Sequence, residues 1–372
     1  MKKNLILVIF SIIFTLGTVE VFLRCFSPQI MEHDKMFEFD NTLGWKFIPN
    51  KTGAIVYSGE ARHYIKTNEI GFRDASLPNS LNNKKVLVLG DSFVSNISVK
   101  DDEVFTEVME QKLEDNIVLN FGVNGYGQIQ EYLLLQQWLP KINPDLIILM
   151  IYIRNDFTDN LKNNDWLYSR PSASWNKEKQ VLEIHPISNF EKKKKRVSTK
   201  FYHKLHVYHL IRTKINNIKN KFDPSEQINS ISYTPPELYL CRSELSESTQ
   251  LMYVIMENIL LKISDYAKKS NTPLVFALAP SIVQVQDELW ESTLSNADRN
   301  QDKYKRSLPN DKLMNFAKKN DLHMIDLLPI LRLERSKGEK LYNSKEQHWT
   351  AMGNKVVANT ILEYLTQKSL IE

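Results

Sequence analysis

Cysteine is scarce in this chain, and several familiar catalytic motifs are missing. Only two cysteines occur among 372 residues, Cys25 and Cys241, which excludes a disulfide framework. The chain has no Walker-type phosphate loop, no dinucleotide-binding glycine fingerprint and no His-Glu-x-x-His motif. The Gly-x-Ser-x-Gly elbow of ordinary α/β-hydrolases is also missing. These absences argue against nucleotide-dependent chemistry, zinc proteolysis and an ordinary α/β-hydrolase.

The chain also has no large excess of positive or negative charge. Lysine and arginine number 48 against 44 aspartates and glutamates, a formal net charge of +4. This excess is too small and too dispersed to indicate nucleic-acid binding. Hydrophobic residues at 42% and charged residues at 25% are ordinary globular values. The length leaves room for one large domain and an accessory piece.

The N-terminus predicts a membrane anchor over residues 1–26. Two lysines precede an apolar stretch from about Leu5 to Leu23, whose length is marginal to adequate for a membrane span. No small-residue cleavage site follows, so a retained signal anchor is favoured over a removed signal peptide. The flanking charges predict a cytoplasmic N-terminus and a catalytic domain on the periplasmic or extracellular side. The alternative is a buried amphipathic helix of a cytosolic protein.

Downstream of this segment, the chain divides into an extension and a larger α/β domain. Residues 27–82 hold short apolar runs separated by turn residues, which predicts a β-rich extension. Residues 83–372 then alternate between strand and helix patterns, which implies a parallel sheet covered on both faces. Strands are expected at 85–89, 116–120, 146–153, 273–278 and 323–327, and helices near 104–113, 128–138, 249–268 and 351–365.

A basic insertion at about 160–245 interrupts this rhythm. It contains the run 192–196, four lysines and an arginine, followed by apolar residues at helical spacing from Leu205 to Phe222. The favoured interpretation is an amphipathic helix packed on the domain with a solvated basic face. The alternative is a helix near anionic lipid headgroups. Its histidines rotate around the helix without a carboxylate or cysteine nearby, so a metal site is not expected.

Four polar clusters carry the candidate chemistry. Gly90-Asp91-Ser92-Phe93 directly follows a strand-like apolar run, where a tight turn would expose a serine nucleophile. Residues 120–127 and Arg154-Asn155-Asp156 follow two further apolar runs, and Glu346-Gln347-His348-Trp349 lies near the C-terminus. Because parallel strands end at one edge of a sheet, most of these clusters should meet there.

Each cluster supplies a residue type that ester chemistry needs. Ser92 requires a base, and His348, directly before the last predicted helix, is the best candidate. Glu346 is expected to orient the imidazole, although a carbonyl could do so instead. The Ser92 N–H, the Gly125 N–H and the Asn155 side-chain amide form a coherent set of oxyanion donors. Taken singly, Gly125 could be a turn glycine and Asn155 a helix cap.

The ordered set of Gly90-Asp91-Ser92, Gly125, Asn155-Asp156 and His348 resembles the Ser-Gly-Asn-His (SGNH, or GDSL-type) hydrolase superfamily, especially its membrane-anchored bacterial members. The segments 43–45, 68–73 and 122–127 also look like recurring segments of that group.

The resemblance implies a three-layer α/β sandwich around a five-stranded parallel, flavodoxin-like sheet. It also implies ester chemistry without metal or cofactor in a shallow, open site. In that scheme Ser92 is the nucleophile, Gly125 and Asn155 are oxyanion donors, and His348 is the base.

Two positions depart from the family pattern. Ile153 stands where a glycine is usual, and Lys345 stands where the last block usually has aspartate. The Glu-x-His-Trp sequence ending at Trp349 is similar to the Asp-x-His-Trp pattern of carbohydrate O-acetyltransferases, with glutamate substituted.

These residues together predict an exported, anchored serine esterase. Its expected substrate is an acyl ester, such as the O-acyl groups of cell-surface carbohydrate or lipid. Two alternatives stay open: an O-acyltransferase that delivers the acyl group to a polysaccharide, and a non-catalytic envelope binding module. The oligomeric state does not follow from the sequence.

Overall fold

The structure is a computed structural model that describes most of the chain. The described residues are 2–26, 36–53, 63–74, 83–113, 116–162, 168–187, 205–208, 210–211, 236–297, 303–343 and 347–371. The chain divides into two compact units, one of residues 1–34 and 193–232 and the other of residues 35–192 and 233–372. The candidate chemistry lies in the second unit.

A five-stranded parallel sheet forms the centre of this second unit, as predicted. Its strands are β5 (Lys84–Gly90), β6 (Asn116–Gly122), β7 (Leu146–Tyr152), β10 (Leu274–Ala279) and β11 (His323–Asp326), in the order β6-β5-β7-β10-β11. The strand order reverses between β5 and β7, and ligands of open α/β sheets bind at such a switch point. The register pairs Gly90 with Gly122, so β5 and β6 end side by side.

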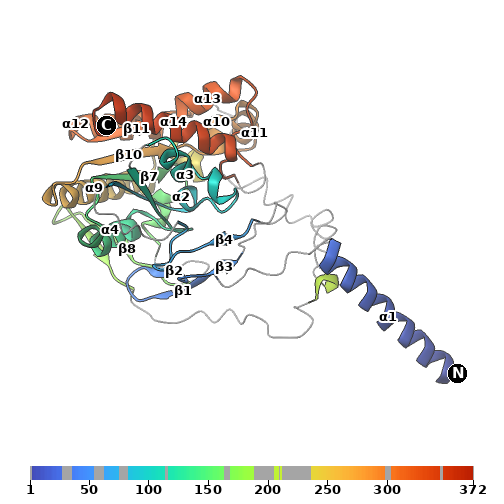
Figure 1. The fold of residues 1–372 in the computed structure, drawn as a ribbon. Coiled ribbons are helices and arrows are strands. Elements are labelled where there is room, and N and C mark those ends of the chain that lie inside the picture. The colour runs from blue at the N-terminus through green and yellow to red at the C-terminus, as the bar shows by residue number, and fades with distance from the viewer. Residues whose placement is uncertain are drawn as a thin grey trace. The chain divides into compact units, whose positions relative to one another are not determined.

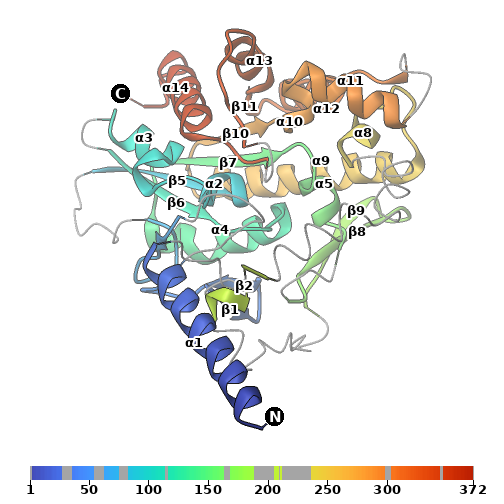
Figure 2. The same ribbon diagram turned by 90° about the vertical axis from the view of Figure 1, so that its right-hand side faces the viewer.

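Alternate side chains of each strand face opposite layers. Leu87 and Leu89 belong to one buried cluster, whereas Val86 and Val88 belong to the other. The first layer includes α4 (Gln128–Ile142), α9 (Glu247–Lys269) and α12 (Leu308–Lys319), and the second includes α3 (Phe105–Glu110), α10 (Ile282–Val285), α11 (Asp287–Ala297), α13 (Leu328–Ser336) and α14 (Ala351–Gln367). Figures 1 and 2 show the sheet between α4 on one side and α3 and α14 on the other.

The β-rich extension forms two small antiparallel pairs. β1 (Phe37–Asp40) pairs with β2 (Gly44–Phe47), and β3 (Thr52–Gly53) pairs with β4 (Ile65–Lys66). The fully buried ring of Trp45 belongs to the cluster on the α4 side of the sheet. The described part of the extension therefore packs into the same core as the sheet.

The insertion differs from its prediction where it is described. Part of it is a β-hairpin of β8 (Ser172–Asn176) and β9 (Val181–His185), which was not expected. Of the predicted helix only residues 205–208 and 210–211 are described, and all of these except Leu205 are helical. The basic run 192–196 lies outside the described residues. A short helix, α8 (Pro236–Leu240), precedes α9.

The N-terminal segment is a single helix, α1 (Lys2–Phe26). Among the residues that the structure describes, none of the helices combines the length and apolarity needed to cross a bilayer. The predicted membrane anchor is therefore not confirmed.

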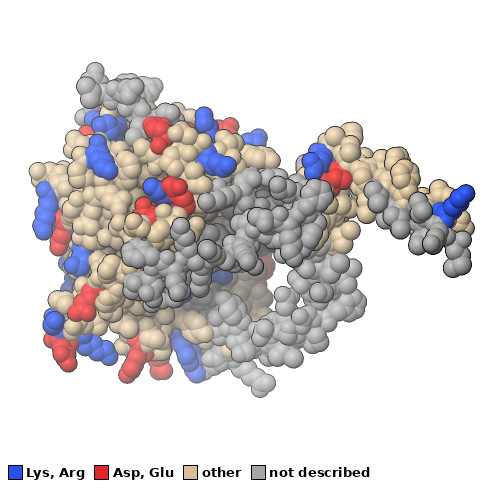
Figure 3. Space-filling model, turned by 90° about the horizontal axis from the view of Figure 1, so that it is seen from below, with Lys and Arg blue, Asp and Glu red and all other residues tan. Residues whose placement is uncertain are grey.

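Charged side chains are mixed on the surface of the second unit. Figure 3 shows lysines and arginines interspersed with aspartates and glutamates over the described residues of one face. This mixture matches the small net charge of +4. Among the described residues of this face, lysines and arginines therefore do not gather apart from aspartates and glutamates.

Candidate active site

Ser92 lies at the switch point of the sheet, on the turn that follows β5. It begins a one-turn helix, α2 (Ser92–Ser95), whose N-cap is Asp91. The Asp91 carboxylate accepts the Phe93 N–H at 2.8 Å, which satisfies one of the free donors at the helix start. The Ser92 side chain is half-buried, whereas its neighbours Asp91 and Phe93 are buried. The strand–turn–helix arrangement thus leaves the Ser92 side chain partly accessible on an otherwise packed turn.

His348 lies beside this serine although 256 positions separate the two residues. The distance from His348 Nε2 to Ser92 Oγ is 2.8 Å, within the range of a nucleophile–base hydrogen bond. If Ser92 donates its hydroxyl hydrogen, the imidazole carries its proton on Nδ1. The His348 ring also contacts Phe93, with ring centroids 5.0 Å apart.

The loop before α14 is fixed at several points. Asn343 N donates to the His348 carbonyl at 2.9 Å, and Arg154 donates to the Gln347 side chain at 2.5 Å. Arg154 lies two residues after the end of β7, so this bond joins two of the four polar clusters. Asn96 Nδ2, just after α2, donates to the Trp349 carbonyl at 3.3 Å. These contacts hold the histidine loop against the turn that carries the serine.

Gly125 lies in a tight turn after β6. Tyr126 N donates to the Val123 carbonyl at 3.1 Å, and Gly125 has a φ of +79°. A positive φ at the third position is what a type II turn requires, which explains why glycine suits this position. The Asn124 side chain accepts a hydrogen bond from Ser95 Oγ at 2.9 Å. This bond connects the Gly125 turn directly to α2.

The side chain of Asn155 is engaged with carboxylates. Asn155 is the N-cap of α5 (Asp156–Asp159), and its Nδ2 donates to Asp159 at 3.0 Å and to Asp156 at 3.3 Å. An oxyanion at this position would compete with these carboxylates for the amide hydrogens. Among the three expected donors, the Asn155 amide is thus the one with internal partners of its own.

Buried carboxyl groups lie beneath the site. Burial raises the pKa of Asp91 to about 6, although its hydrogen bond from Phe93 N acts in the opposite direction. Burial also raises the pKa of Asp156 well above its usual value, and the nearby Asp91 and Glu131 add to this. Glu131, on α4, is fully buried, and neither of its carboxyl oxygens has a hydrogen-bond partner. Burial and the charge of Asp91 raise its pKa well above the usual range.

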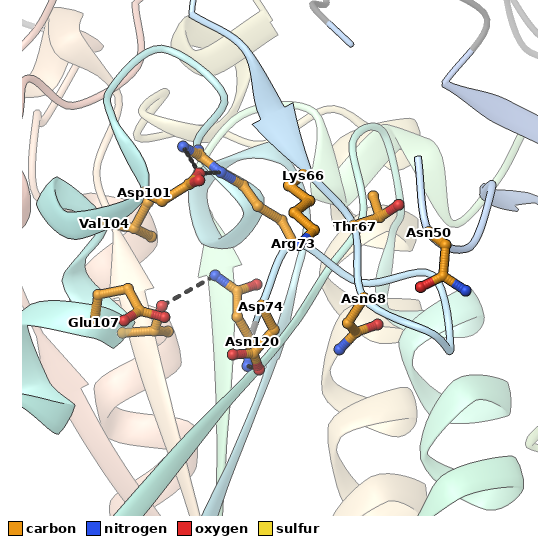
Figure 4. Close-up of a pocket in the computed structure, with 11 residues that line it drawn as sticks. Asn50, Lys66, Thr67, Asn68, Arg73, Asp74, Asp101, Val104, Glu107 and Asn120 are labelled. Carbon is orange, nitrogen blue, oxygen red and sulfur yellow. Dashed lines mark hydrogen bonds and ion pairs between the residues drawn. The ribbon is translucent and has the colours of Figure 1, made fainter. Parts of the chain in front are cut away.

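Arg73 of the extension supports the other side of the nucleophile turn. Its buried guanidinium donates to the carbonyls of Ser95, Asn96 and Val99, with distances of 2.9 Å to Ser95 and 2.7 Å to Val99. It also pairs with Asp101 of the short 3₁₀ helix η1 (Asp101–Glu103) at 2.7 Å. Figure 4 shows this pair at the wall of a polar cavity of about 300 Å³.

Of the two positions that depart from the family pattern, Ile153 and Lys345, the structure describes only Ile153. Ile153 is fully buried in the cluster on the α4 side, so its side chain fills the core. Lys345 and the predicted orienting acid Glu346 lie outside the described residues.

Across the described ranges, no group of three or more histidine, cysteine, aspartate or glutamate side chains could hold a metal ion.

Sequence reasoning missed three supporting side chains: Trp45, Arg73 and Arg170. Trp45 Nε1 donates to the Asn124 carbonyl at 3.0 Å, and Arg170 donates to the Gly125 carbonyl. Trp45 and Arg73 fall in segments that resemble recurring family segments, which was a signal of importance but not of role. Arg170 gave no signal, because it stands alone in an insertion.

Comparisons with known proteins give structural likenesses only. No family model matches the chain, and no curated protein matches it. A lipolytic protein of the G-D-S-L family from Veillonella parvula DSM 2008 is 14% identical, with a TM-score of 0.40 over 76% of this chain and 99% of that one.

Two further solved structures are acetylxylan esterases. The acetyl xylan esterase AlAXEase is 11% identical, with a TM-score of 0.39 over 75% of this chain and 98% of its own. A catalytic mutant of an acetylxylan esterase from Geobacillus stearothermophilus is 11% identical, with a TM-score of 0.37 over 77% and 96%. The solved structures similar to this chain thus include a G-D-S-L lipolytic protein and acetylxylan esterases, each at 14% sequence identity or less.

Proposed function

We propose that this protein is a serine esterase in which Ser92 is the nucleophile and His348 the general base. The observation that carries the proposal is the distance of 2.8 Å between Ser92 Oγ and His348 Nε2. A serine hydroxyl is a weak nucleophile at neutral pH, and an adjacent imidazole is the usual means of activating it.

The reaction follows from this pair. Ser92 Oγ attacks the ester carbonyl carbon while its proton passes to His348 Nε2, and the carbonyl oxygen becomes an oxyanion. The backbone N–H groups of Ser92 and Gly125 stabilise that oxyanion, with the Asn155 amide as a third donor. The intermediate collapses to an acyl-enzyme, and His348 returns the proton to the departing alcohol. Water activated by His348 then releases the acid.

Substrate and location extend the same proposal. We place the ester on cell-surface carbohydrate or lipid, because the N-terminal lysines and apolar stretch predict an exported, tethered chain. Side chains of α1 such as Phe10 and Phe14 are two-thirds exposed, which supports an apolar partner for this helix. Fractionation of cells that produce the full chain tests the location. Recovery of the protein in the cytosolic fraction would contradict it.

Hydrolysis of short-chain aryl esters by purified protein tests the chemistry. We expect Ser92→Ala and His348→Ala each to lower kcat by about 10⁴-fold or more, because each removes half of the nucleophile–base pair. His323→Ala is a matched control, since this histidine lies exposed at the sheet edge and should leave turnover unchanged. Retention of wild-type turnover by folded Ser92→Ala would refute the proposal.

Two further measurements separate the alternatives that the sequence leaves open. A phosphonofluoridate should label Ser92 in the wild type, because it reacts with an activated serine; an unlabelled protein would favour the binding module. Product analysis with an acyl donor, with and without oligosaccharide, distinguishes hydrolysis from acyl transfer. We expect free acid to dominate, and a larger yield of acylated sugar would make the protein an acyltransferase.

A further inference from the structure

The peptide between Asn124 and Gly125 carries one of the proposed oxyanion donors. In a trans peptide the C=O and the N–H point in opposite directions, and the described residues contain no cis peptide bond. The Asn124 carbonyl accepts the indole N–H of Trp45 at 3.0 Å. The Gly125 N–H therefore points away from Trp45 and from the core in which this ring is buried.

This peptide is the one that a tight turn can reverse. It is the central peptide of the turn from Val123 to Tyr126, and type I and type II turns differ in the orientation of that unit. The positive φ of Gly125 corresponds to type II. In a type I turn the same N–H would point to the opposite side. A partner on the Asn124 carbonyl therefore decides where the donor points.

Trp45 itself is held rigidly. Its side chain has no exposed surface, and the Tyr126 ring lies edge-on to it with centroids 5.7 Å apart. The Tyr126 hydroxyl donates to the Trp45 carbonyl. The guanidinium of Arg170 lies 5.0 Å from the centre of the indole and donates to the Gly125 carbonyl. Both carbonyls that flank the Gly125 N–H are thus bound by buried donors.

We propose that Trp45 is a positioning residue for the esterase reaction: its indole N–H holds the Asn124–Gly125 peptide in the orientation that directs the Gly125 N–H at the oxyanion. This inference rests on the proposed function. Trp45 does not touch the substrate, and it acts only through the peptide that it binds. Loss of its N–H should therefore weaken transition-state stabilisation and leave substrate binding and the ionisation of His348 unchanged.

Replacement of the tryptophan by phenylalanine tests the inference, and the chain offers a matched control. Trp45→Phe keeps an aromatic ring and removes the N–H donor. Trp290→Phe makes the same change at a buried tryptophan of α11, which also lies beneath an arginine, with Arg306 at 4.9 Å. We expect Trp45→Phe to lower kcat by about 100- to 1,000-fold, the effect of losing one oxyanion donor, with KM and the pH profile unchanged. Trp290→Phe should retain wild-type kcat.

A thionoester substrate separates positioning from a general loss of structure. Its C=S sulfur accepts hydrogen bonds poorly, so a missing N–H should slow an ester more than the matching thionoester. The ratio of ester to thionoester kcat should therefore fall in Trp45→Phe and stay constant in Trp290→Phe. If Trp45→Phe does not fold, 3-benzothienylalanine at position 45 keeps the shape of the indole without its N–H.

An unchanged ratio in a folded variant at position 45 would overturn the inference while leaving the esterase intact. A wild type without Ser92-dependent turnover would instead overturn the proposed function.

Discussion

The unpaired carboxyl group of Glu131 makes the stability of this protein dependent on pH. Glu131 lies in the first turn of α4, where the helix dipole favours a negative charge by about 0.3–1 kcal/mol. Leaving a buried polar group without a partner costs about 1–3 kcal/mol, and more when it is charged. Desolvation therefore outweighs the dipole and raises the pKa of Glu131 well above its usual value of 4.5. The folded protein keeps this carboxyl protonated at pH values at which the unfolded chain has already lost the proton.

The sign of the effect follows from this raised pKa. Below about pH 4.5 the carboxyl is protonated in both the folded and the unfolded chain, so it adds no pH dependence. As pH rises toward the folded-state pKa, the unfolded chain gives up the proton and the folded chain does not. The free energy of unfolding then falls by about 1.4 kcal/mol per pH unit from this group alone. Glu131→Gln abolishes this term with little change in side-chain volume.

Chemical denaturation from pH 4.5 to pH 8 measures the difference. We expect Glu131→Gln to match or fall slightly below the wild type at pH 4.5, because its amide is also buried without a partner. Its advantage should then grow by about 1.4 kcal/mol per pH unit until the folded-state pKa is reached. Glu363→Gln, at an exposed position on α14, should show no such trend. A difference between Glu131→Gln and the wild type that does not change with pH would refute the reasoning.

Three other side chains near the site give predictions. Gly122→Ala should lower the unfolding free energy by about 1–3 kcal/mol and reduce kcat, because its Cβ would lie 2.3 Å from the Ser95 backbone nitrogen. Gly338→Ala, which has open space around it but a φ of +96° that strains alanine, should lose stability and spare kcat. Protonation of Asp91 below about pH 6 removes a negative charge 3.3 Å from Ser92 Oγ, which helps to balance the imidazolium that forms in the transition state, so kcat/KM should fall with two ionisations in the wild type and with one in Asp91→Asn. Arg73→Lys should cost at least about 2 kcal/mol in denaturant melts and reduce kcat, because an ammonium cannot reproduce the fork that binds three carbonyls. Unchanged kcat in Gly122→Ala, a second ionisation in Asp91→Asn, or wild-type stability in Arg73→Lys would contradict the respective prediction.

The sheet could be predicted from the sequence because its strands are buried on both faces. Near-continuous apolar runs such as Leu146–Tyr152 have few other interpretations, and the expected strand bounds differ from the structure by no more than two residues. The helices α11–α13 were missed because they are short, with 9 to 12 residues each, so the helical repeat of apolar residues runs over only a few turns. In α12, for example, the side chains buried in the first layer include Leu313 and Ala317 among charged neighbours. The hairpin β8–β9 was missed because basic residues later in the insertion dominated its interpretation.

The candidate site could likewise be predicted from the sequence only in part. The approach of His348 to Ser92 follows from topology, since the loop before the last helix returns to the carboxyl end of the sheet. The contacts that orient the proposed oxyanion donors do not follow, because a hydrogen bond between Trp45 and Asn124, 79 positions apart, leaves no local pattern. Glu131 illustrates the same limit. One carboxyl in an amphipathic helix is ordinarily solvated, and only the three-dimensional packing shows that this one is buried.

The extension connects this site to the stability of the sheet. β6 is an edge strand, and an exposed edge leaves backbone donors unpaired. Asp74, directly after Arg73, accepts the Asn120 N–H of β6 at 2.7 Å, and Phe72 stacks on Phe121 with centroids 3.9 Å apart. The same strand ends at the turn that carries Gly125. Asp74, which covers the edge of β6, is therefore the direct neighbour of Arg73, which supports the nucleophile turn. Changes at the edge of β6 should alter turnover as well as stability.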